Sequence, residues 1–384
     1  MIYLDNASTT YPKPESVYKA MDKFLRELGV SPGRGGYESA VQVGRIISDT
    51  RTRIANFFGG DFPEKLIFAL NTTDALNIAI KGTLKKGDNV ITTHLEHNSI
   101  SRPLKRLEDS GFITVTKVDS PPDGFIDPDD IKKAINKNTK LVAITHASNV
   151  TGVIQPIGEI GRTIKEVNDK VLFLVDCAQT AGVCDINVKK FCIDLLAFPG
   201  HKALFGPPGT GGLYVNGDII LSPWREGGTG VDSIAPTQPT NMPFWLEAGT
   251  PNTVGIIGLN EGLKFVIEKG INTIFEHESN LVAHMISHLK NDDRFIIYGS
   301  KDAKKHVGCL SVNIKGMKPQ EVEVGIDKLA GIAVRTGLQC APYVHRKIGS
   351  FPDGTVRLSP GIFNTEEDVN IALTSLKQIA DRKK

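Results

Sequence analysis

The segments VLFLVD (171–176) and AFPGHKALFG (197–206) decide the fold of this chain. The first is an apolar run that ends on Asp176, and the second carries Lys202 in a loop next to glycines. Short apolar runs rich in Val, Leu and Ile are typical of strands in a parallel sheet that is covered on both faces. We therefore expect Asp176 to close a buried strand and Lys202 to follow a neighbouring one.

The region from 65 to about 215 repeats this pattern, with apolar runs separated by stretches long enough for crossover helices (97–110, 127–137 and 156–169). This alternation predicts an α/β fold with a large, mostly parallel seven-stranded sheet. The predicted strands are 65–70, 88–93, 113–119, 140–146, 171–176, 194–199 and 211–216.

The chain of 384 residues exceeds the usual size of a single core, so two lobes are expected. The segment 222–253 is rich in Gly and Pro and reads as a long functional loop or domain connection, followed by a helix over 253–269. The predicted division is an N-terminal arm over 1–15, a large domain over 16–255 and a small C-terminal α/β domain over 256–384 that carries the Cys340 loop and Arg357.

The composition excludes several classes of protein. Charged residues make up 23% of the chain with a net charge of +2, which indicates neither a nucleic-acid partner nor a membrane partner. The five cysteines are odd in number and irregularly spaced, which argues for a reducing compartment. The N-terminus has an acid where a signal peptide would have its apolar run, so a cytoplasmic location is expected.

The residues at the strand ends favour a pyridoxal phosphate site. A lysine amine can form a Schiff base with the cofactor, and a buried aspartate can pair with its pyridinium nitrogen. Ligands of such sheets bind beyond the carboxyl ends of the strands. The polar residues at or just after predicted strand ends are Asn71, His97, Asn149, Asp176 and His201.

Three motifs have competing interpretations. Thr72 and Thr73 open a predicted helix, where they either form an anion site or simply cap the helix. His94 and His97 form a weak metal pair, and His97 could instead stack on a planar cofactor; no metal site is predicted. The run GPPGTGG (206–212) resembles a nucleotide-binding loop, but it lacks the lysine and the following helix.

The C-terminal region contributes Cys340 and Arg357. Cys340 lies in a polar loop that is near Arg335, His345, Arg346 and Lys347 in sequence, a cationic and partly exposed setting that favours the thiolate. Arg357 is expected in a bend beside a strand, where it could clamp a substrate carboxylate; a surface salt bridge is the alternative.

Together these segments resemble the cysteine desulfurase and selenocysteine lyase branch of the class V aminotransferases, which have the fold-type I architecture of pyridoxal phosphate enzymes. The resemblance extends from residue 3 to residue 365. It rests on motifs that occur in family order: DNASTT (5–10), SNVTG (148–152), DCAQTAG (176–182), GHK (200–202), EAGTPNT (247–253) and RTGLQCA (335–341).

The resemblance implies a role for each site residue. Lys202 would form the Schiff base, Asp176 would pair with the ring nitrogen, Gln179 would reach the ring hydroxyl, and His97 would stack on the ring and shuttle protons. The phosphate would be held by Thr72, Thr73 and His201, and by Thr250 of a neighbouring subunit, which implies a homodimer. Asn149 and Arg357 would hold the substrate carboxylate, and Cys340 would take up sulfur as a persulfide.

Two departures from the family pattern are visible. Pro199 stands where relatives usually have a serine that donates to the phosphate, and Leu338 and Gln339 precede Cys340 where close relatives often have histidine. The leading hypothesis is conversion of L-cysteine to L-alanine, with the persulfide passed to an acceptor. The alternatives are selenocysteine lysis, transamination or β-elimination on the same scaffold, and an inactive sulfur carrier or scaffold protein.

Overall fold

The computed structural model describes residues 1–32, 36–121 and 123–382. Its largest sheet has seven strands in the order β2-β8-β7-β6-β5-β3-β4. All seven predicted strands form within one residue of their predicted bounds. The strands are β2 (Leu66–Ala69), β3 (Asn89–Thr93), β4 (Thr114–Val118), β5 (Thr139–Thr145), β6 (Leu172–Asp176), β7 (Leu195–Pro199) and β8 (Gly211–Val215). The predicted mostly parallel sheet is confirmed, since β8 is antiparallel to both of its neighbours and the other pairs are parallel.

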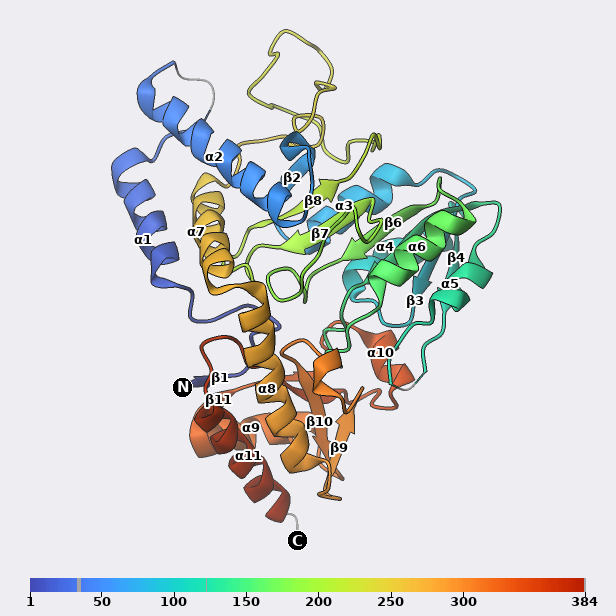
Figure 1. The fold of residues 1–384 in the computed structure, drawn as a ribbon, viewed down its shortest axis with the longest axis vertical. Helices are drawn as coiled ribbons and strands as arrows, with labels where there is room; N and C mark the ends of the chain where they lie inside the picture. Colours follow the sequence, from blue (N-terminus) through green and yellow to red (C-terminus); the bar gives the residue numbers. More distant parts are fainter. Residues whose placement is uncertain (33–35, 122, 383–384) are drawn as a thin grey trace.

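Helices cover both faces of this sheet, as Figure 1 shows. Alternate strand residues face opposite sides, so each face has its own apolar cluster. One face packs against α2 (Glu38–Phe57), α5 (Pro128–Ala134), α6 (Ile157–Val167) and α7 (Thr253–Lys269). The other packs against α3 (Thr72–Thr83) and α4 (Asn98–Asp109). The result is a three-layer α/β/α unit, with α1 (Glu15–Lys23) and the π-helical turn Phe24–Leu28 packed outside α7.

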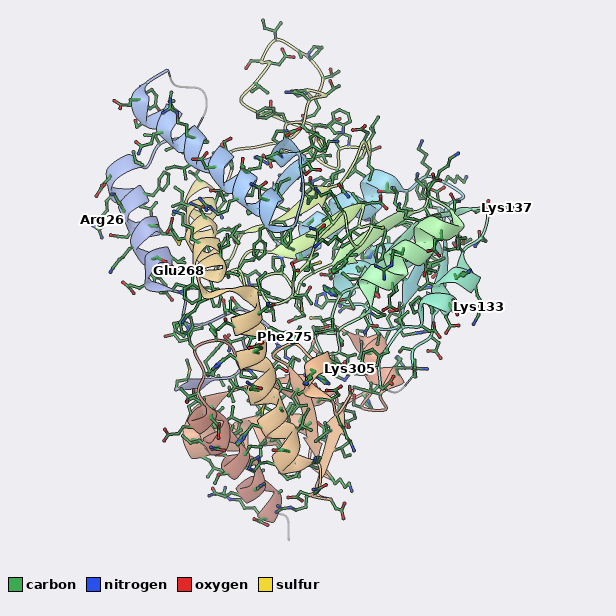
Figure 2. All side chains as sticks on the ribbon, in the orientation of Figure 1. Arg26, Lys133, Lys137, Glu268, Phe275 and Lys305 are labelled. Atoms are coloured by element: carbon green, nitrogen blue, oxygen red, sulfur yellow. The ribbon has the colours of Figure 1, made fainter. Side chains whose placement is uncertain are left out.

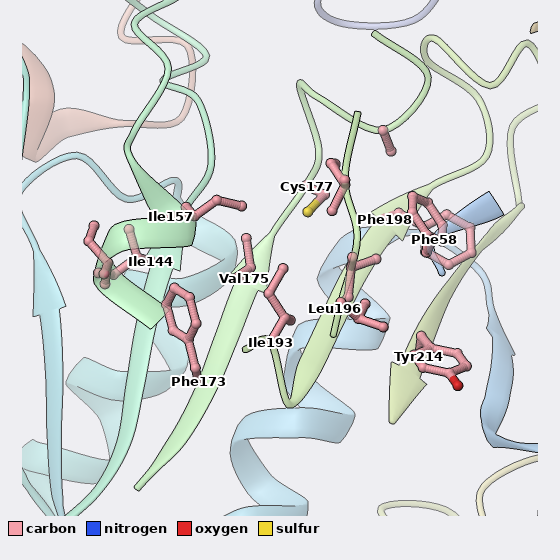
Figure 3. Close-up of a cluster of buried hydrophobic side chains, with 14 of the residues drawn as sticks. Phe58, Ile144, Ile157, Phe173, Val175, Cys177, Ile193, Leu196, Phe198 and Tyr214 are labelled. Carbon is pink, nitrogen blue, oxygen red and sulfur yellow. The ribbon is translucent and has the colours of Figure 1, made fainter. Parts of the chain in front are cut away.

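The core on the first face contains large side chains from neighbouring strands (Figure 3). Phe173, Phe198 and Tyr214 are fully buried there, and the ring of Phe58 from the end of α2 lies 5.1 Å from that of Phe198. Burial of each such side chain contributes about 1.5–3 kcal/mol. This packing fixes β6 and β7, whose carboxyl ends carry Asp176 and lead to Lys202.

A second, smaller unit follows α7. Its antiparallel sheet has the order β12-β13-β10-β9, formed by β9 (Phe295–Tyr298), β10 (Leu310–Ile314), β12 (Arg335–Gly337) and β13 (Thr355–Leu358). It packs with α8 (Ile271–Leu289), α9 (Pro319–Ala330) and α11 (Glu366–Asp381), while the short α10 (Pro342–Lys347) follows Cys340. The expectation that Arg357 lies in a bend is wrong: it lies within β13, an inner strand of this sheet.

The N-terminal arm reaches both units. Its strand β1 (Ile2–Tyr3) pairs with β11 (Ile332–Ala333), and Leu4 is buried in the apolar cluster of the small unit. A few residues later, the Thr10 hydroxyl donates to the Lys202 carbonyl at 2.9 Å. The arm therefore connects the small sheet to the lysine loop of the large unit.

The long segment between β8 and α7 contains no helix or strand, in accord with the predicted loop, and α7 begins at Thr253 as predicted. Charged side chains such as Arg26, Lys133 and Lys137 extend outward at widely separated places (Figure 2). Within the described residues, no helix has both the length and the apolar character needed to cross a bilayer.

Candidate active site

Asp176 and Lys202 come from adjacent parallel strands. Asp176 ends β6 opposite Ala197 of β7, and its Oδ1 accepts a hydrogen bond from the Ala178 amide at 2.9 Å. The carboxyl group is 1% exposed, and this burial raises its pKa to about 6, while the Ala178 amide and the Lys202 charge act in the opposite direction. The carboxylate is thus mostly ionised at neutral pH and is available to a cationic partner.

Lys202 follows β7 in the loop that contains Gly200 and Gly206. Burial lowers the pKa of its amine to about 8, and the nearby Asp176 charge opposes this shift. Within the described part of the chain, no hydrogen bond or ion pair is formed by its Nζ atom. A lysine with a lowered pKa and an uncommitted amine suits imine formation with a carbonyl compound.

The N-terminal arm holds the backbone of the lysine loop. The His201 carbonyl accepts hydrogen bonds from the Thr9 hydroxyl at 3.0 Å and from Lys13 Nζ at 2.7 Å. Thr10 contributes its amide to the same carbonyl and its hydroxyl to the Lys202 carbonyl. These bonds fix the two residues that the sequence assigns to the cofactor.

His97 caps the N-terminus of α4. Its Nδ1 accepts a hydrogen bond from the Ser99 amide at 3.1 Å, so the proton of the neutral ring is on Nε2. Burial, followed by the charges of Lys202, Arg102 and Arg357, lowers its pKa to about 4. His97 is therefore a neutral imidazole at physiological pH with a transferable Nε2 proton.

Other candidate cofactor residues lie at the same edge of the sheet. Thr72 and Thr73 are the first residues of α3, whose N-cap Asn71 accepts a hydrogen bond from Asp74. The pKa of His201 is lowered to about 4 by burial and by Lys202 and Lys13, which keeps the ring neutral. Gln179 is buried and donates to the Ala7 carbonyl at 3.1 Å. The helix terminus can bind an anion through its free amides.

Arg357 and Asn149 are in direct contact. The Arg357 guanidinium donates to the Asn149 carbonyl at 2.9 Å and to Asp5 Oδ1 and Ser8 Oγ at 2.7 Å each. Its side chain is 3% exposed, and its Nε atom is buried without a partner among the described residues. The arginine predicted as a carboxylate clamp is thus held by the N-terminal arm.

Cys340 lies on a turn that touches the same residues. Cys340 is exposed, and its backbone carbonyl accepts a hydrogen bond from the Asn98 amide at 2.8 Å. The carbonyl of the preceding residue, Gln339, accepts a hydrogen bond from the Asn149 side chain at 2.7 Å. The structure therefore joins Cys340 to the start of α4, just after His97, and to Asn149.

The expected cationic setting of Cys340 is wrong for one of its residues. His345 is fully buried, and this burial lowers its pKa to about 4, so it carries no charge at neutral pH. Lys347 pairs with Asp119 at 2.6 Å, and Arg346 lies over the ring of Phe351.

Thr250 is placed apart from these residues. It lies in an exposed loop on the wall of a cavity of about 600 Å³ between α2 and the β2–β8 edge. The floor of this cavity includes Arg51 and Glu247, which form a two-pronged ion pair at 2.7 and 2.9 Å. Neither Asp176 nor Lys202 lines the cavity, so the structure does not bring Thr250 to the lysine of its own chain.

The sequence reasoning missed the contributions of Asp5, Ser8, Thr10 and Lys13. The motif DNASTT was noticed as a pattern, but nothing in its spacing indicated contact with residues about 190 and 350 positions away. It also missed Glu96, which is 1% exposed and accepts from Thr93 Oγ1 at 2.7 Å and from the Thr145 amide at 2.8 Å. An acid between Leu95 and His97, just after a predicted strand, was the available signal.

The remaining motifs show ordinary structure. His284 and His288, which stand four residues apart in the sequence, lie on α8 with ring centres 4.3 Å apart and ring planes tilted by 46°. Among the described residues, no group of three acids, cysteines or histidines is arranged to hold a metal ion. The glycine run 206–212 turns directly into β8, so no helix N-terminus follows it.

Comparison with known proteins agrees with this geometry. The family model for class V aminotransferases matches residues 2–371. A probable cysteine desulfurase of Methanothermobacter thermautotrophicus is 36% identical over 99% of this chain and 94% of its own, and a cysteine desulfurase of Escherichia coli O157:H7 is 31% identical over 99% and 93%.

Solved structures give the same result. The apo cysteine desulfurase of Thermococcus onnurineus superposes with a TM-score of 0.93 at 33% identity, covering 99% of this chain and 95% of that one. The cysteine desulfurase CsdA of Escherichia coli gives 0.88 at 25% identity, covering 99% and 94%. The predicted fold and the predicted resemblance are confirmed: this chain belongs to the class V aminotransferase family, in its cysteine desulfurase branch.

Proposed function

We propose that this enzyme is a pyridoxal phosphate-dependent cysteine desulfurase, which converts L-cysteine to L-alanine and takes up the sulfur on Cys340. The observation that carries the proposal is the position of Asn149 between Arg357 and the Cys340 turn. A substrate whose carboxylate binds at Arg357 and Asn149 would have its side chain within the region that the Cys340 turn borders. The full-length likeness to cysteine desulfurases supports the same activity.

The residues present fit pyridoxal phosphate. A buried carboxylate, an uncommitted lysine with a lowered pKa, two neutral histidines and a helix N-terminus meet at one sheet edge. We infer that Lys202, Asp176, Gln179 and His97 hold the ring and that Thr72, Thr73 and His201 hold the phosphate. When bound, the cofactor supplies an electron sink for the substrate Cα.

The chain's own residues then have distinct tasks. Arg357 and Asn149 orient the substrate carboxylate. The Lys202 amine removes the Cα proton, which its pKa of about 8 allows without a large cost for deprotonation. His97, neutral with its proton on Nε2, passes a proton to or from the substrate.

Cys340 takes up the sulfur. Its thiolate attacks the substrate sulfur, the new S–S bond forms as the substrate Cβ–S bond breaks, and the electron pair of that bond stays on the carbon side. Protonation of that carbon and return of a proton to Cα, from which Lys202 removed one, yield alanine, and Cys340 carries a persulfide. The sum is cysteine plus protein thiol giving alanine plus protein persulfide, which needs no external oxidant.

The wider organisation follows from the same proposal. We infer a functional division into the arm 1–15, the large domain 16–255 and the small domain 256–384. We also infer a homodimer in which Thr250 reaches the phosphate in the partner subunit, and transfer of the persulfide sulfur to an acceptor protein. The cytoplasmic location stays a prediction.

Alanine production from L-cysteine under a thiol reductant tests the proposal, with wild type and Cys340→Ala compared at equal cofactor content. We expect alanine from the wild type only, together with a mass increase of one sulfur on the Cys340 peptide when the reductant is omitted. Equal alanine from both proteins would remove Cys340 from the reaction. Activity on selenocysteine alone, independent of Cys340, would favour a lyase.

A further inference from the structure

Two consecutive non-glycine residues adopt left-handed backbone angles at the thiol. Gln339 has φ of 38° and Cys340 has φ of 58°. Side chains with a Cβ atom rarely occupy this region, and such residues persist only where their surroundings hold them. The turn that presents Cys340 therefore needs an anchor.

The Gln339 side chain supplies this anchor from the small sheet. It is 6% exposed, its Nε2 donates to the Thr355 carbonyl at 2.9 Å, and its Oε1 lies 3.3 Å from the Thr355 hydroxyl. Thr355 is the first residue of β13, the strand that carries Arg357 two positions later. The amide thus attaches the Cys340 turn to the strand of the predicted carboxylate clamp.

The network continues to the segment of Asn149. The Thr355 hydroxyl lies 2.9 Å from Ser311 Oγ, and Ser311 donates to the Val150 carbonyl at 2.7 Å. From the other side, Asn149 Nδ2 donates to the Gln339 carbonyl at 2.7 Å. The side chain of Gln339 is therefore held by Thr355 of β13, and its backbone carbonyl is held by Asn149.

The backbone of Cys340 is fixed in the same way. Its carbonyl accepts from the Asn98 amide, and the Ala341 amide donates to the Leu338 carbonyl, both at 2.8 Å. The residues on either side of Gln339 differ from it: Leu338 is partly exposed and Cys340 is exposed. Of these three residues, only Gln339 is buried, although its side chain is polar.

We propose that Gln339 is a positioning residue for sulfur uptake, whose buried amide holds the Cys340 turn in its left-handed conformation beside Asn149. The inference rests on the proposed function, since it assigns Gln339 a part in the step at Cys340. It gives a reason for glutamine at this place: the amide nitrogen donates to the Thr355 carbonyl, and the amide oxygen faces the Thr355 hydroxyl as an acceptor.

The test compares Gln339→Met, which keeps the length of the side chain but removes its polar atoms, with Gln339→Gly, which relaxes the backbone but lacks the anchor. The matched control is Gln378→Met on the exposed face of α11. The readouts are the kcat and KM for L-cysteine, the cofactor absorbance, and the alkylation rate of the Cys340 peptide by iodoacetamide, followed by mass spectrometry.

We expect both Gln339 variants to lose at least tenfold in kcat, with KM changed less than twofold, unchanged cofactor absorbance, and an altered alkylation rate. The control should match the wild type. A general structural defect would instead change KM and the absorbance as well. If Gln339→Met does not retain cofactor, Thr355→Val is the second variant: it keeps the Thr355 carbonyl that accepts from Gln339 and removes the hydroxyl that faces Gln339 Oε1 and Ser311 Oγ, and a three- to fivefold loss in kcat is expected from it.

Wild-type kcat and alkylation rate in Gln339→Met would overturn the inference, and so would wild-type behaviour of Gln339→Gly, which would show that the amide is dispensable. Failure of the wild type itself to form a Cys340 persulfide would overturn the proposed function instead. In that event the alkylation rates alone decide whether Gln339 positions the thiol.

Discussion

The ion pair between Asp5 and Arg357 allows a quantitative prediction. The two side chains are 14% and 3% exposed, and their atoms are 2.7 Å apart. Removing one partner of a buried pair leaves the other charge without compensation, which costs about 3–5 kcal/mol, whereas an exposed pair contributes about 0–1 kcal/mol. We therefore expect Asp5→Ala to destabilise the protein by about 3–5 kcal/mol. Asp5→Asn should cost less, because its amide oxygen can still accept from Arg357.

The assay is thermal unfolding at a fixed excess of cofactor. Unfolding entropy scales as roughly 2 cal/mol/K per residue, so about 3–5 kcal/mol corresponds to a drop in Tm of about 4–6 °C for a chain of this length. The matched control is Asp130→Ala, which breaks an ion pair with Lys133 whose side chains are 47% and 74% exposed; its Tm should change by about 1 °C or less. The double variant Asp5→Ala with Arg357→Met should regain part of the loss. If Asp5→Ala behaves like the control, the arm does not hold Arg357 and the argument fails.

Three further predictions follow from single groups. Burial raises the pKa of Glu96 to about 8 from an unfolded value near 4.5, so folding takes up a proton and the stability of the protein falls as the pH rises between these values. Glu96→Gln, which cannot ionise, should be more stable than wild type at pH 8 by on the order of 4 kcal/mol and about equal to it at pH 4.5. A wild type that is the more stable at pH 8 would contradict this. The Lys202 amine has a pKa of about 8, so its neutral, reactive form increases about tenfold per pH unit below pH 8. The rate at which cofactor-free protein captures pyridoxal phosphate, followed by absorbance with Lys202→Ala as the blank, should rise in the same way and level off above pH 8. A capture rate that does not depend on pH would show that the neutral amine is not the reacting form. Lys13→Met removes two hydrogen bonds of 2.7 Å each, one to the His201 carbonyl and one to Thr10 Oγ1. It should weaken cofactor binding about fivefold, a loss of about 1 kcal/mol in an absorbance titration. Unchanged affinity would show that the threonines hold the loop without Lys13.

The sequence predicted the large sheet well because its signal is local. The strands are short runs of four to seven residues, and β3, β5, β6, β7 and β8 are buried almost throughout, so periodicity and length suffice for most of them. The edge strand β4 is more polar and partly exposed. The rule that ligands bind beyond the carboxyl ends of parallel strands then placed Asp176, His97 and His201 at one edge without knowledge of their contacts.

The small unit was harder to predict, since its sheet is antiparallel and its polar residues are internal. Arg357 was expected in a bend, but it lies in β13 between β10 and β12, opposite Ser311 and Arg335. Its buried side chain is held by Asp5, Ser8 and Asn149, which are distant in sequence. His345 was counted as a cation from its neighbours in sequence, whereas its own burial keeps it neutral. Charge state depends on surroundings that only the tertiary structure supplies.

The N-terminal arm shows why such a site cannot be assembled from local patterns alone. Asp5 holds Arg357 in the small unit, and Thr10 and Lys13 hold the carbonyls of His201 and Lys202 in the large unit. The arm is also fixed at its start, where β1 pairs with β11 and Leu4 is buried. A displacement of Arg357 relative to Lys202 would therefore have to stretch or break hydrogen bonds within one nine-residue stretch, from Asp5 to Lys13. Since a substrate held by its carboxylate at Arg357 must present its Cα to the Lys202 amine, the geometry of the proposed reaction depends on this stretch as much as on the two residues that it connects.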